Sequence, residues 1–204
     1  KPINEWITED MINDEKWYGS DTRWYIGHDY ILSKGDDVLT KMCEIVGIHK
    51  GVVKGYEKNA IGAQYIMKGL THYYWDRVER ESELLFKDIN ELNKQKKQLD
   101  PTHHELQIWC ADMWAVLWNA WKMRVHTECH PNMEFSWATS NEEDYKRMNI
   151  FHNAGAVNST SGLFYKAEYM NKLPYNEILD IKKGTTSYEY WKLIQNTAKK
   201  SVLI

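Results

Sequence analysis

The sequence predicts a mixed α/β, helix-rich protein, and three features lead to that prediction. Residues 103–123 carry apolar side chains nearly all round and indicate a buried central helix. Residues 71–99 repeat apolar side chains at helical spacing with charges between them, which is typical of an amphipathic helix. Several short segments rich in β-branched and aromatic residues predict a small sheet, at 23–26, 51–54, 125–129 and 133–137.

The composition is that of a folded protein with one core. The chain has 204 residues, of which 43% are hydrophobic and 27% charged, so we expect a single domain over 1–204. The net charge of −3 and the isoelectric point near 6.3 argue against a broad phosphate-binding surface. Nucleic acid is therefore disfavoured as a partner.

The lengths of the apolar runs and the number of cysteines indicate in which cellular compartment the protein is expected. No run reaches the roughly 18 apolar residues that a membrane span needs, so we expect no membrane within this chain. Cys43, Cys110 and Cys129 are odd in number and widely spaced, which favours reduced thiols over a disulfide framework. We therefore expect a soluble, cytoplasmic protein.

The first part of the chain predicts short elements. Apolar residues at helical spacing over 38–47 follow Asp36 and Asp37, and we expect one of these acids to cap that helix. A metal site at the acidic pair is the weaker alternative. The segments 23–26 and 51–54 are predicted as strands.

Small residues and an amide then occur together in the segment 61–69. Gly62 and Ala63 would let a ligand approach the backbone closely, while Gln64 offers both a donor and an acceptor. A turn into an ordinary strand accounts for the same residues equally well. The amphipathic helix over 71–99 follows.

The predicted central helix carries one narrow polar stripe. Glu105, Asp112 and Asn119 recur at intervals of seven, which at about 100° per residue places them on one side of the helix. A carboxylate among tryptophans must be paired or face a cavity, because burying a bare charge costs several kcal/mol. Asp112 is thus a candidate for chemistry, and a structural ion pair or cap is the alternative.

The ten tryptophans are open to two interpretations. They can form the core, or their flat amphipathic rings can bind the faces of sugars and nucleobases. Beyond the central helix, 125–129 and 133–137 suggest a hairpin-like strand pair, and 188–203 a final amphipathic helix. His126 and His130 are interpreted as structural, because Pro131 argues against the helix that would bring both onto one metal.

Four segments in order resemble one family. They are Gly62-Ala-Gln-Tyr-Ile-Met-Lys, a long helix with Trp75 and Val78, Trp109-Cys-Ala-Asp-Met-Trp, and Phe151-His-Asn-Ala-Gly. Together they resemble the C-terminal half of a GT-A nucleotide-sugar glycosyltransferase. The pattern is similar to the hydroxyproline arabinosyltransferase-like and peptidyl serine galactosyltransferase-like group, with relatives in large viruses and phages. The resemblance covers about residues 55–166, with Ile61 in place of a glycine and Asp112 in place of a glutamate.

The resemblance implies a fold, a reaction and a set of site residues. It implies a metal-assisted transfer with Mn²⁺ or Mg²⁺, retention of configuration at the sugar, a nucleotide-sugar donor and an acceptor that the sequence does not identify. Asp112 would face the reacting centre, Lys166 would steady the leaving diphosphate, and His152 would complete the metal site. The remaining donor- or acceptor-binding candidates are Gln64, Gly62, Ala63, Trp109 and Glu105. For His152, a structural histidine bonded to backbone is the alternative.

One departure from the family is important. GT-A enzymes carry an Asp-x-Asp motif after a strand, and this sequence has no convincing copy, while Lys1-Pro2 resembles the dipeptide that follows that motif. We therefore expect these residues to be the acceptor-side half of a longer enzyme, without the N-terminal nucleotide-binding half. The alternatives are a noncatalytic Trp-rich module that binds carbohydrate or protein, and a metal-dependent hydrolase, which is weaker because no His-Glu-x-x-His spacing occurs.

Overall fold

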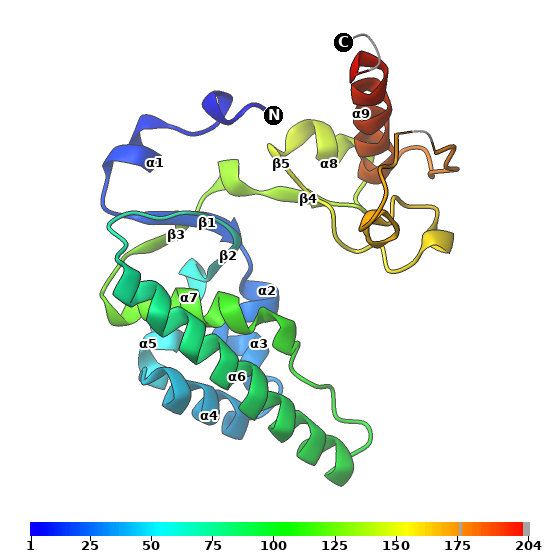
Figure 1. The fold of residues 1–204 in the computed structure, drawn as a ribbon. Coiled ribbons are helices and arrows are strands. Elements are labelled where there is room, and N and C mark those ends of the chain that lie inside the picture. The colour runs from blue at the N-terminus through cyan, green and yellow to red at the C-terminus, as the bar shows by residue number, and fades with distance from the viewer. Residues whose placement is uncertain (176, 202–204) are drawn as a thin grey trace. The chain divides into compact units, whose positions relative to one another are not determined.

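The computed structural model describes residues 1–175 and 177–201, and the contacts gather into two compact units where the sequence predicted one domain. One unit is Ile7–Met133, and the other combines Lys1–Trp6 with Glu134–Ile204. Helices and small sheets occur together (Figure 1), so the mixed α/β, helix-rich class is confirmed. None of the helices in the described ranges has both the length and the apolar character that crossing a membrane requires.

The unit Ile7–Met133 contains a three-stranded sheet in the order β2-β1-β3. Strand β2 runs antiparallel to β1, with an irregularity in register between Gly19 and Ser20, and β3 runs parallel to β1. The strands are β1 (Trp17–Asp21), β2 (Ile61–Ile66) and β3 (Thr127–Cys129).

Helices make up most of the rest of this unit. Helix α6 packs on α7 and on α4, and α7 also packs on strand β2. The α-helices are α1 (Glu9–Asn13), α2 (Arg23–Ile26), α3 (His28–Leu32), α4 (Asp36–Val46), α5 (Lys50–Gly55), α6 (His72–Leu99) and α7 (Ala111–Lys122). The 3-10 turns are η2 (Glu57–Asn59), η3 (Ile108–Cys110) and η4 (Pro131–Met133).

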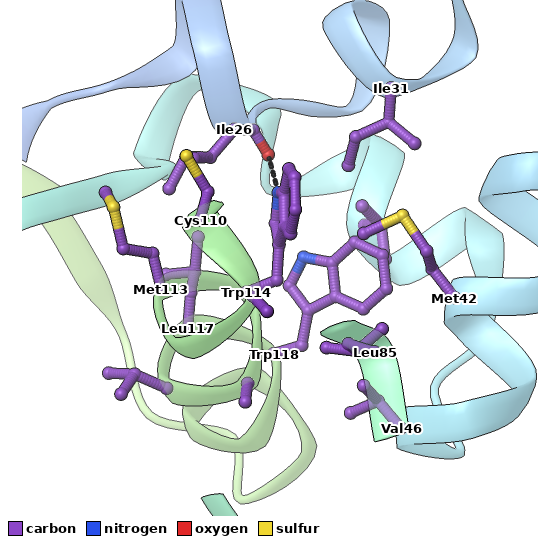
Figure 2. Packing of buried hydrophobic residues seen from close by; sticks show 14 of the residues in the cluster. Ile26, Ile31, Met42, Val46, Leu85, Cys110, Met113, Trp114, Leu117 and Trp118 are labelled. Atoms are coloured by element: carbon purple, nitrogen blue, oxygen red, sulfur yellow. Dashed lines mark hydrogen bonds between the residues drawn. The ribbon is translucent and has the colours of Figure 1, made fainter. Parts of the chain in front are cut away.

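The core of this unit surrounds α7, as the sequence predicted. Trp114 and Trp118 are fully buried, and Figure 2 shows both rings among side chains of the surrounding helices, including Met42 and Leu85. The indole Nε1 of Trp114 donates to the carbonyl of Ile26 over 2.9 Å. Such a bond matters because a buried donor without a partner costs free energy.

All three cysteines are free, as the thiol interpretation predicted. Burial raises the pKa of the Cys43 thiol to about 11 and the pKa values of Cys110 and Cys129 to about 12. These thiols are therefore protonated at neutral pH and are poor nucleophiles.

The central helix starts later than predicted. It begins at Ala111, after the 3-10 turn η3, and residues 103–107 have no helical structure. The side chain of Asn93 explains this, because it donates to the carbonyl of Leu106 (3.0 Å) and accepts from its N–H (3.2 Å). Both main-chain groups of Leu106 are thus used by α6 and not by a helical turn.

Two predicted strands are helices. Residues 23–26 form α2, in which the N–H groups of Tyr25 and Ile26 donate to the carbonyl of Thr22 and the N–H of Arg23 donates to the Asp21 carboxylate. Residues 50–55 form α5, where Nδ1 of His49 accepts from Gly51 N–H as an N-cap. In both places a side-chain acceptor in front of the segment satisfies an N-terminal donor of a helix, which outweighs the β-propensity of the residues.

The helix over 38–47 is confirmed as α4, although its N-cap is Gly35. Asp36 and Asp37 lie in its first turn and pair with Lys50 and Lys96. These acids therefore have structural partners. The interpretation of the pair as a helix-start signal, and not as a metal site, agrees with this arrangement.

The second unit holds a two-stranded parallel sheet and one long helix. Strand β4 (Phe135–Trp137) pairs with β5 (Ile150–His152), so the predicted hairpin of 125–129 with 133–137 is wrong: β3 pairs with β1 in the other unit. The final helix is confirmed as α9 (Thr186–Ser201), while residues 202 and 203 of the predicted helix lie outside the described residues. Phe164 stacks on Tyr169 and on Trp191. The other elements are η1 (Ile3–Glu5), α8 (Glu142–Arg147), η5 (Ser159–Ser161) and η6 (Lys166–Tyr169).

A polar cluster ties the end of α1 to the sheet. Asp14 accepts hydrogen bonds from Lys68 (2.7 Å) and from the hydroxyl of Tyr18. The Lys68 bond and then the Tyr18 bond lower the pKa of Asp14 to about 2 from its usual 3.8. The folded state therefore binds a proton at Asp14 less readily than the unfolded chain does.

We expect this cluster to make stability depend on acid. A depressed pKa adds stability that is fully present above the unfolded value of 3.8 and is lost as the pH falls through about 2. The free energy of unfolding should therefore fall more between pH 5 and pH 2 in the wild-type chain than in the variant Asp14→Asn, in urea titrations at each pH. Parallel curves for the two proteins would show that Asp14 contributes nothing to the acid sensitivity.

Candidate functional site

Two tryptophans of the unit Ile7–Met133 lie exposed beside one buried tyrosine. The exposed fractions are 62% for Trp24 and 60% for Trp109, whereas Tyr25 is only 3% exposed. The Tyr25 ring meets the Trp24 ring edge-on at 4.4 Å between centroids and stacks on the Trp109 ring at 5.9 Å. We call Trp24, Tyr25 and Trp109 the aromatic surface.

Exposure of Trp109 departs from the core role that helical spacing predicts. The 3-10 turn η3 replaces the first helical turn, and its three residues per turn bury Cys110 while Trp109 faces solvent. Large exposed aromatic side chains held by ring contacts are typical of binding surfaces. The tryptophans thus divide between core and surface.

Asp112 lies three residues after Trp109, in the first turn of α7. It is exposed, so the prediction of a buried carboxylate among tryptophans is wrong. The reason is again the start of the helix at Ala111, which turns Asp112 outward while Met113 and Trp114 face the core. The positive end of the helix dipole favours a negative side chain at this position.

Tyr65 of strand β2 connects Asp112 with the aromatic surface. Burial and the charge of Asp112 raise the pKa of the Tyr65 phenol, and Tyr25 contributes to the same shift. The phenol therefore keeps its proton at neutral pH. Its oxygen is buried and has no hydrogen-bond partner within the described ranges, so it offers an unused donor close to Asp112.

A strained residue precedes this tyrosine. Ala63 has a φ of 60°, a left-handed conformation that costs an L-residue roughly 1–2 kcal/mol. It lies in β2 opposite the register shift between Gly19 and Ser20. A bulge of this kind re-aims the side chains that follow it, here Gln64 and Tyr65.

Gln64 has a partner inside the sheet. The hydroxyl of Ser20, which is fully buried, lies 2.6 Å from Oε1 of Gln64 and 2.6 Å from the carbonyl of Met133. Gln64 therefore helps to hold the bulge. A direct contact of its amide with a donor or an acceptor stays a prediction.

Gly62 packs against its own chain. A Cβ at this position would lie 2.3 Å from Cε of Met113 and 2.5 Å from Oγ1 of Thr22. Protein packing thus explains the glycine. The role of Gly62 and Ala63 in admitting a ligand to the backbone also stays a prediction.

The polar stripe predicted along one helix does not exist. Glu105 precedes the helix and is exposed, Asp112 is exposed in its first turn, and Asn119 is fully buried. Asn119 donates to the carboxylate of Glu81 over 2.6 Å, inside the contact between α6 and α7. The spacing of seven residues does not place these three side chains on one side of a helix, because the segment before Ala111 is not helical.

His152 and Lys166 belong to the second unit. The His152 ring contacts Phe135 at 5.2 Å and Trp137 at 5.0 Å between centroids. Burial and then the charge of Lys166 lower the pKa of His152, so the imidazole is neutral at pH 7. The structure thus brings these two predicted site residues within electrostatic reach of each other.

A neutral imidazole can ligate a metal, but its surroundings do not complete a site. Nowhere in residues 1–175 and 177–201 do three or more His, Cys, Asp or Glu side chains gather in an arrangement that could hold a metal ion. The nearby charge of Lys166 also opposes a cation. The described residues therefore do not fit Mn²⁺ or Mg²⁺ by themselves.

No family model matches this chain, and neither the curated proteins nor the solved structures contain a match. The likeness to GT-A glycosyltransferases thus depends on the sequence motifs alone. Function must be argued from the geometry above.

Sequence reasoning named Asp112 and Trp109 but missed Trp24, Tyr25 and Tyr65. Trp24 and Tyr25 were assigned to a strand, where one of them would have faced the core. The adjacent pair Trp24-Tyr25 behind the charged Arg23 was the available signal, because two neighbouring aromatic residues cannot both be buried on one face of a strand. Tyr65 lies within the motif Gly62-Ala-Gln-Tyr-Ile-Met-Lys, but its place beside Asp112 depends on the fold and not on that motif.

Proposed function

We propose that this chain is part of a nucleotide-sugar glycosyltransferase and that it holds a sugar on the aromatic surface beside Asp112. The observation that supports this most directly is the pair of exposed tryptophans, Trp24 and Trp109, each in ring contact with Tyr25. The motif resemblance adds the reaction class. Neither argument depends on the other.

A sugar suits this surface for a physical reason. One face of a pyranose carries C–H groups that pack on an indole ring, while its hydroxyl groups need polar partners at the edge. Arg23 and Asp21 supply such an edge next to Trp24, where two guanidinium nitrogens bond to the Asp21 carboxylate. Rings held by neighbouring contacts also lose little conformational freedom when a ligand binds.

Asp112 is the proposed catalytic group. Its carboxylate is exposed and lies close enough to Tyr65 to raise the pKa of that phenol. In the proposed transfer, the acceptor oxygen forms a bond to the anomeric carbon, the bond to the diphosphate breaks with its electron pair, and Asp112 takes the acceptor proton. The negative carboxylate also stabilises positive charge that develops on the sugar.

Lys166 belongs to the other unit, and its proposed role, to steady the leaving diphosphate, comes from the resemblance alone. A divalent ion bound with the donor would offset the same charge. No step assigned to Asp112 requires that ion. Retention at the anomeric carbon is part of the same resemblance-based proposal, and it requires the acceptor oxygen to attack from the face of the sugar that the diphosphate leaves.

The sugar-binding part is tested first by NMR on the 204-residue chain, with neutral oligosaccharides that end in galactose, arabinose or glucose. We expect the indole N–H signals of Trp24 and Trp109 to shift with one of these sugars. The variant Trp109→Ala should weaken binding by about tenfold, since a ring contact contributes on the order of 1 kcal/mol. Trp75→Ala is the matched control, because Trp75 is a partly exposed tryptophan on α6, outside the aromatic surface.

The transfer part is tested by UDP release from UDP-galactose and UDP-arabinose, with Mn²⁺, in the longest natural reading frame that contains this chain. We expect Asp112→Asn to lower the rate by about 10²- to 10⁴-fold, as removal of a general base does. Sugar binding to the same variant should be unchanged within a factor of about two. Turnover that is unaffected by Asp112→Asn would remove Asp112 from the mechanism.

A noncatalytic sugar-binding module is the second candidate. The aromatic surface favours it, because stacking alone is sufficient for binding and requires no donor site. If the oligosaccharides bind but no donor is turned over by the natural reading frame, this second function replaces the first. If no sugar shifts the signals of Trp24 or Trp109, the aromatic surface has another role and both proposals fail.

A further inference from the structure

One cavity of the unit Ile7–Met133 is lined by none of the residues of the aromatic surface. It has a volume of about 440 Å³ and opens between the end of α3 and the segment that joins α6 to α7. This size falls within the range of small-molecule sites. The side chains that line it are mostly basic or hydrogen-bonding: Tyr30, Lys34, Lys97, His103, His104 and Glu105.

Positive charge exceeds negative charge in this cavity. Two ammonium groups, Lys34 and Lys97, face one carboxylate, Glu105. Neither lysine forms an ion pair with a carboxylate in the described part of the chain: Lys34 lies over the Tyr30 ring at 5.0 Å, and Lys97 donates to the carbonyl of His103 at 3.1 Å. Both ammonium charges are therefore available to a ligand.

His103 adds an unused polar atom. Its Nε2 is buried and has no hydrogen-bond partner in the ranges that the structure describes. A buried nitrogen of this kind costs free energy unless something binds it. Rotation of the ring toward the cavity would let a ligand oxygen supply the missing partner.

The segment that carries His103 is held in place. Asp100 accepts from the N–H (2.9 Å) and the hydroxyl (2.6 Å) of Thr102, and from the N–H of His103 (3.0 Å). Asn93 fixes the far end through its two bonds to Leu106. The wall is therefore preorganised, which lowers the entropy cost of binding.

We propose that this cavity binds a phosphate-bearing small molecule, with Lys34, Lys97 and the His103 imidazole around the phosphoryl group. Charged donors form short, strong hydrogen bonds to phosphate oxygens, and lysine is a common phosphate ligand. The single carboxylate of Glu105 lies at the same cavity and suits a hydroxyl group of the attached molecule. The site is independent of the aromatic surface and of the glycosyl transfer proposed above.

The test is a titration of the 204-residue chain with pyrophosphate. Calorimetry measures the affinity, and the ¹⁵N NMR signals of the histidine side chains report on the site. We expect saturable binding, a shift of the His103 Nε2 signal, and a loss of affinity of about tenfold in each of Lys34→Gln and Lys97→Gln. Lys94→Gln is the control, because Lys94 is an exposed lysine of the same helix as Lys97 and does not line the cavity. Its affinity should stay within about twofold of the wild type.

Further titrations separate the sources of the anion. Inorganic phosphate should bind more weakly than pyrophosphate, and succinate should bind more weakly still, because carboxylates carry fewer acceptor oxygens per group. Binding of succinate as tight as that of pyrophosphate would overturn the phosphate assignment. An equal loss in Lys94→Gln, or no shift of the His103 signal, would overturn the site itself.

Discussion

Replacement of Trp114 by Ala should lower the free energy of unfolding by about 3–5 kcal/mol, the usual range for deleting a large core side chain. Trp114 is fully buried, and its ring fills space between α7 and the neighbouring helices (Figure 2). The substitution also leaves the Ile26 carbonyl without its indole donor. Both effects act in the same direction.

The measurement is urea unfolding followed by far-UV circular dichroism, since fluorescence would change with the tryptophan itself. Trp109→Ala is the matched control: the residue type is the same, but its ring is 60% exposed, so we expect a loss of about 1 kcal/mol or less. Trp114→Phe keeps most of the side-chain volume but removes the indole N–H. Its decrease in the free energy of unfolding should lie between those of Trp114→Ala and Trp109→Ala. Equal losses in Trp114→Ala and Trp109→Ala would contradict the assignment of core and surface.

The second large effect is expected at Glu81, a carboxylate in the contact between α6 and α7. Glu81 is 4% exposed, accepts from Asn119 at 2.6 Å and lies 3.9 Å from Nζ of Lys122. Burial lowers the pKa of Lys122, and the charge of Glu81 opposes that shift. Glu81→Leu removes the acceptor of a buried amide and the counter-charge of a partly buried lysine.

We expect Glu81→Leu to lower the free energy of unfolding by about 2–3 kcal/mol, less than for a fully buried ion pair because Lys122 reaches solvent. The double variant Glu81→Leu/Asn119→Leu should lose less than the sum of the two single variants, since no unpaired donor remains. A double-mutant cycle in urea measures the difference. Strict additivity would show that Glu81 and Asn119 do not interact.

The sequence by itself determined the elements that depend on local spacing. Helices α4, α6 and α9 follow from apolar residues at intervals of three and four, because this periodicity decides which side of a helix leaves water. The burial of Trp114 and Trp118 follows for the same reason. In the candidate site, the sequence pointed to Asp112 and Trp109 as residue types that suit sugar chemistry.

Contacts between distant residues decided the rest. The bonds from Asn93 to Leu106 delay the start of α7, and this single change exposes Trp109 and Asp112. Strand β3 pairs with β1, and the charge of Asp112 acts on the phenol of Tyr65. Both interactions join residues that are far apart in the chain. Local propensity does not encode such pairings, because each depends on a side chain elsewhere that competes for the same backbone group or the same space. The tertiary structure alone therefore decided that Trp109 is exposed beside Tyr25 and not buried with the other tryptophans of the segment.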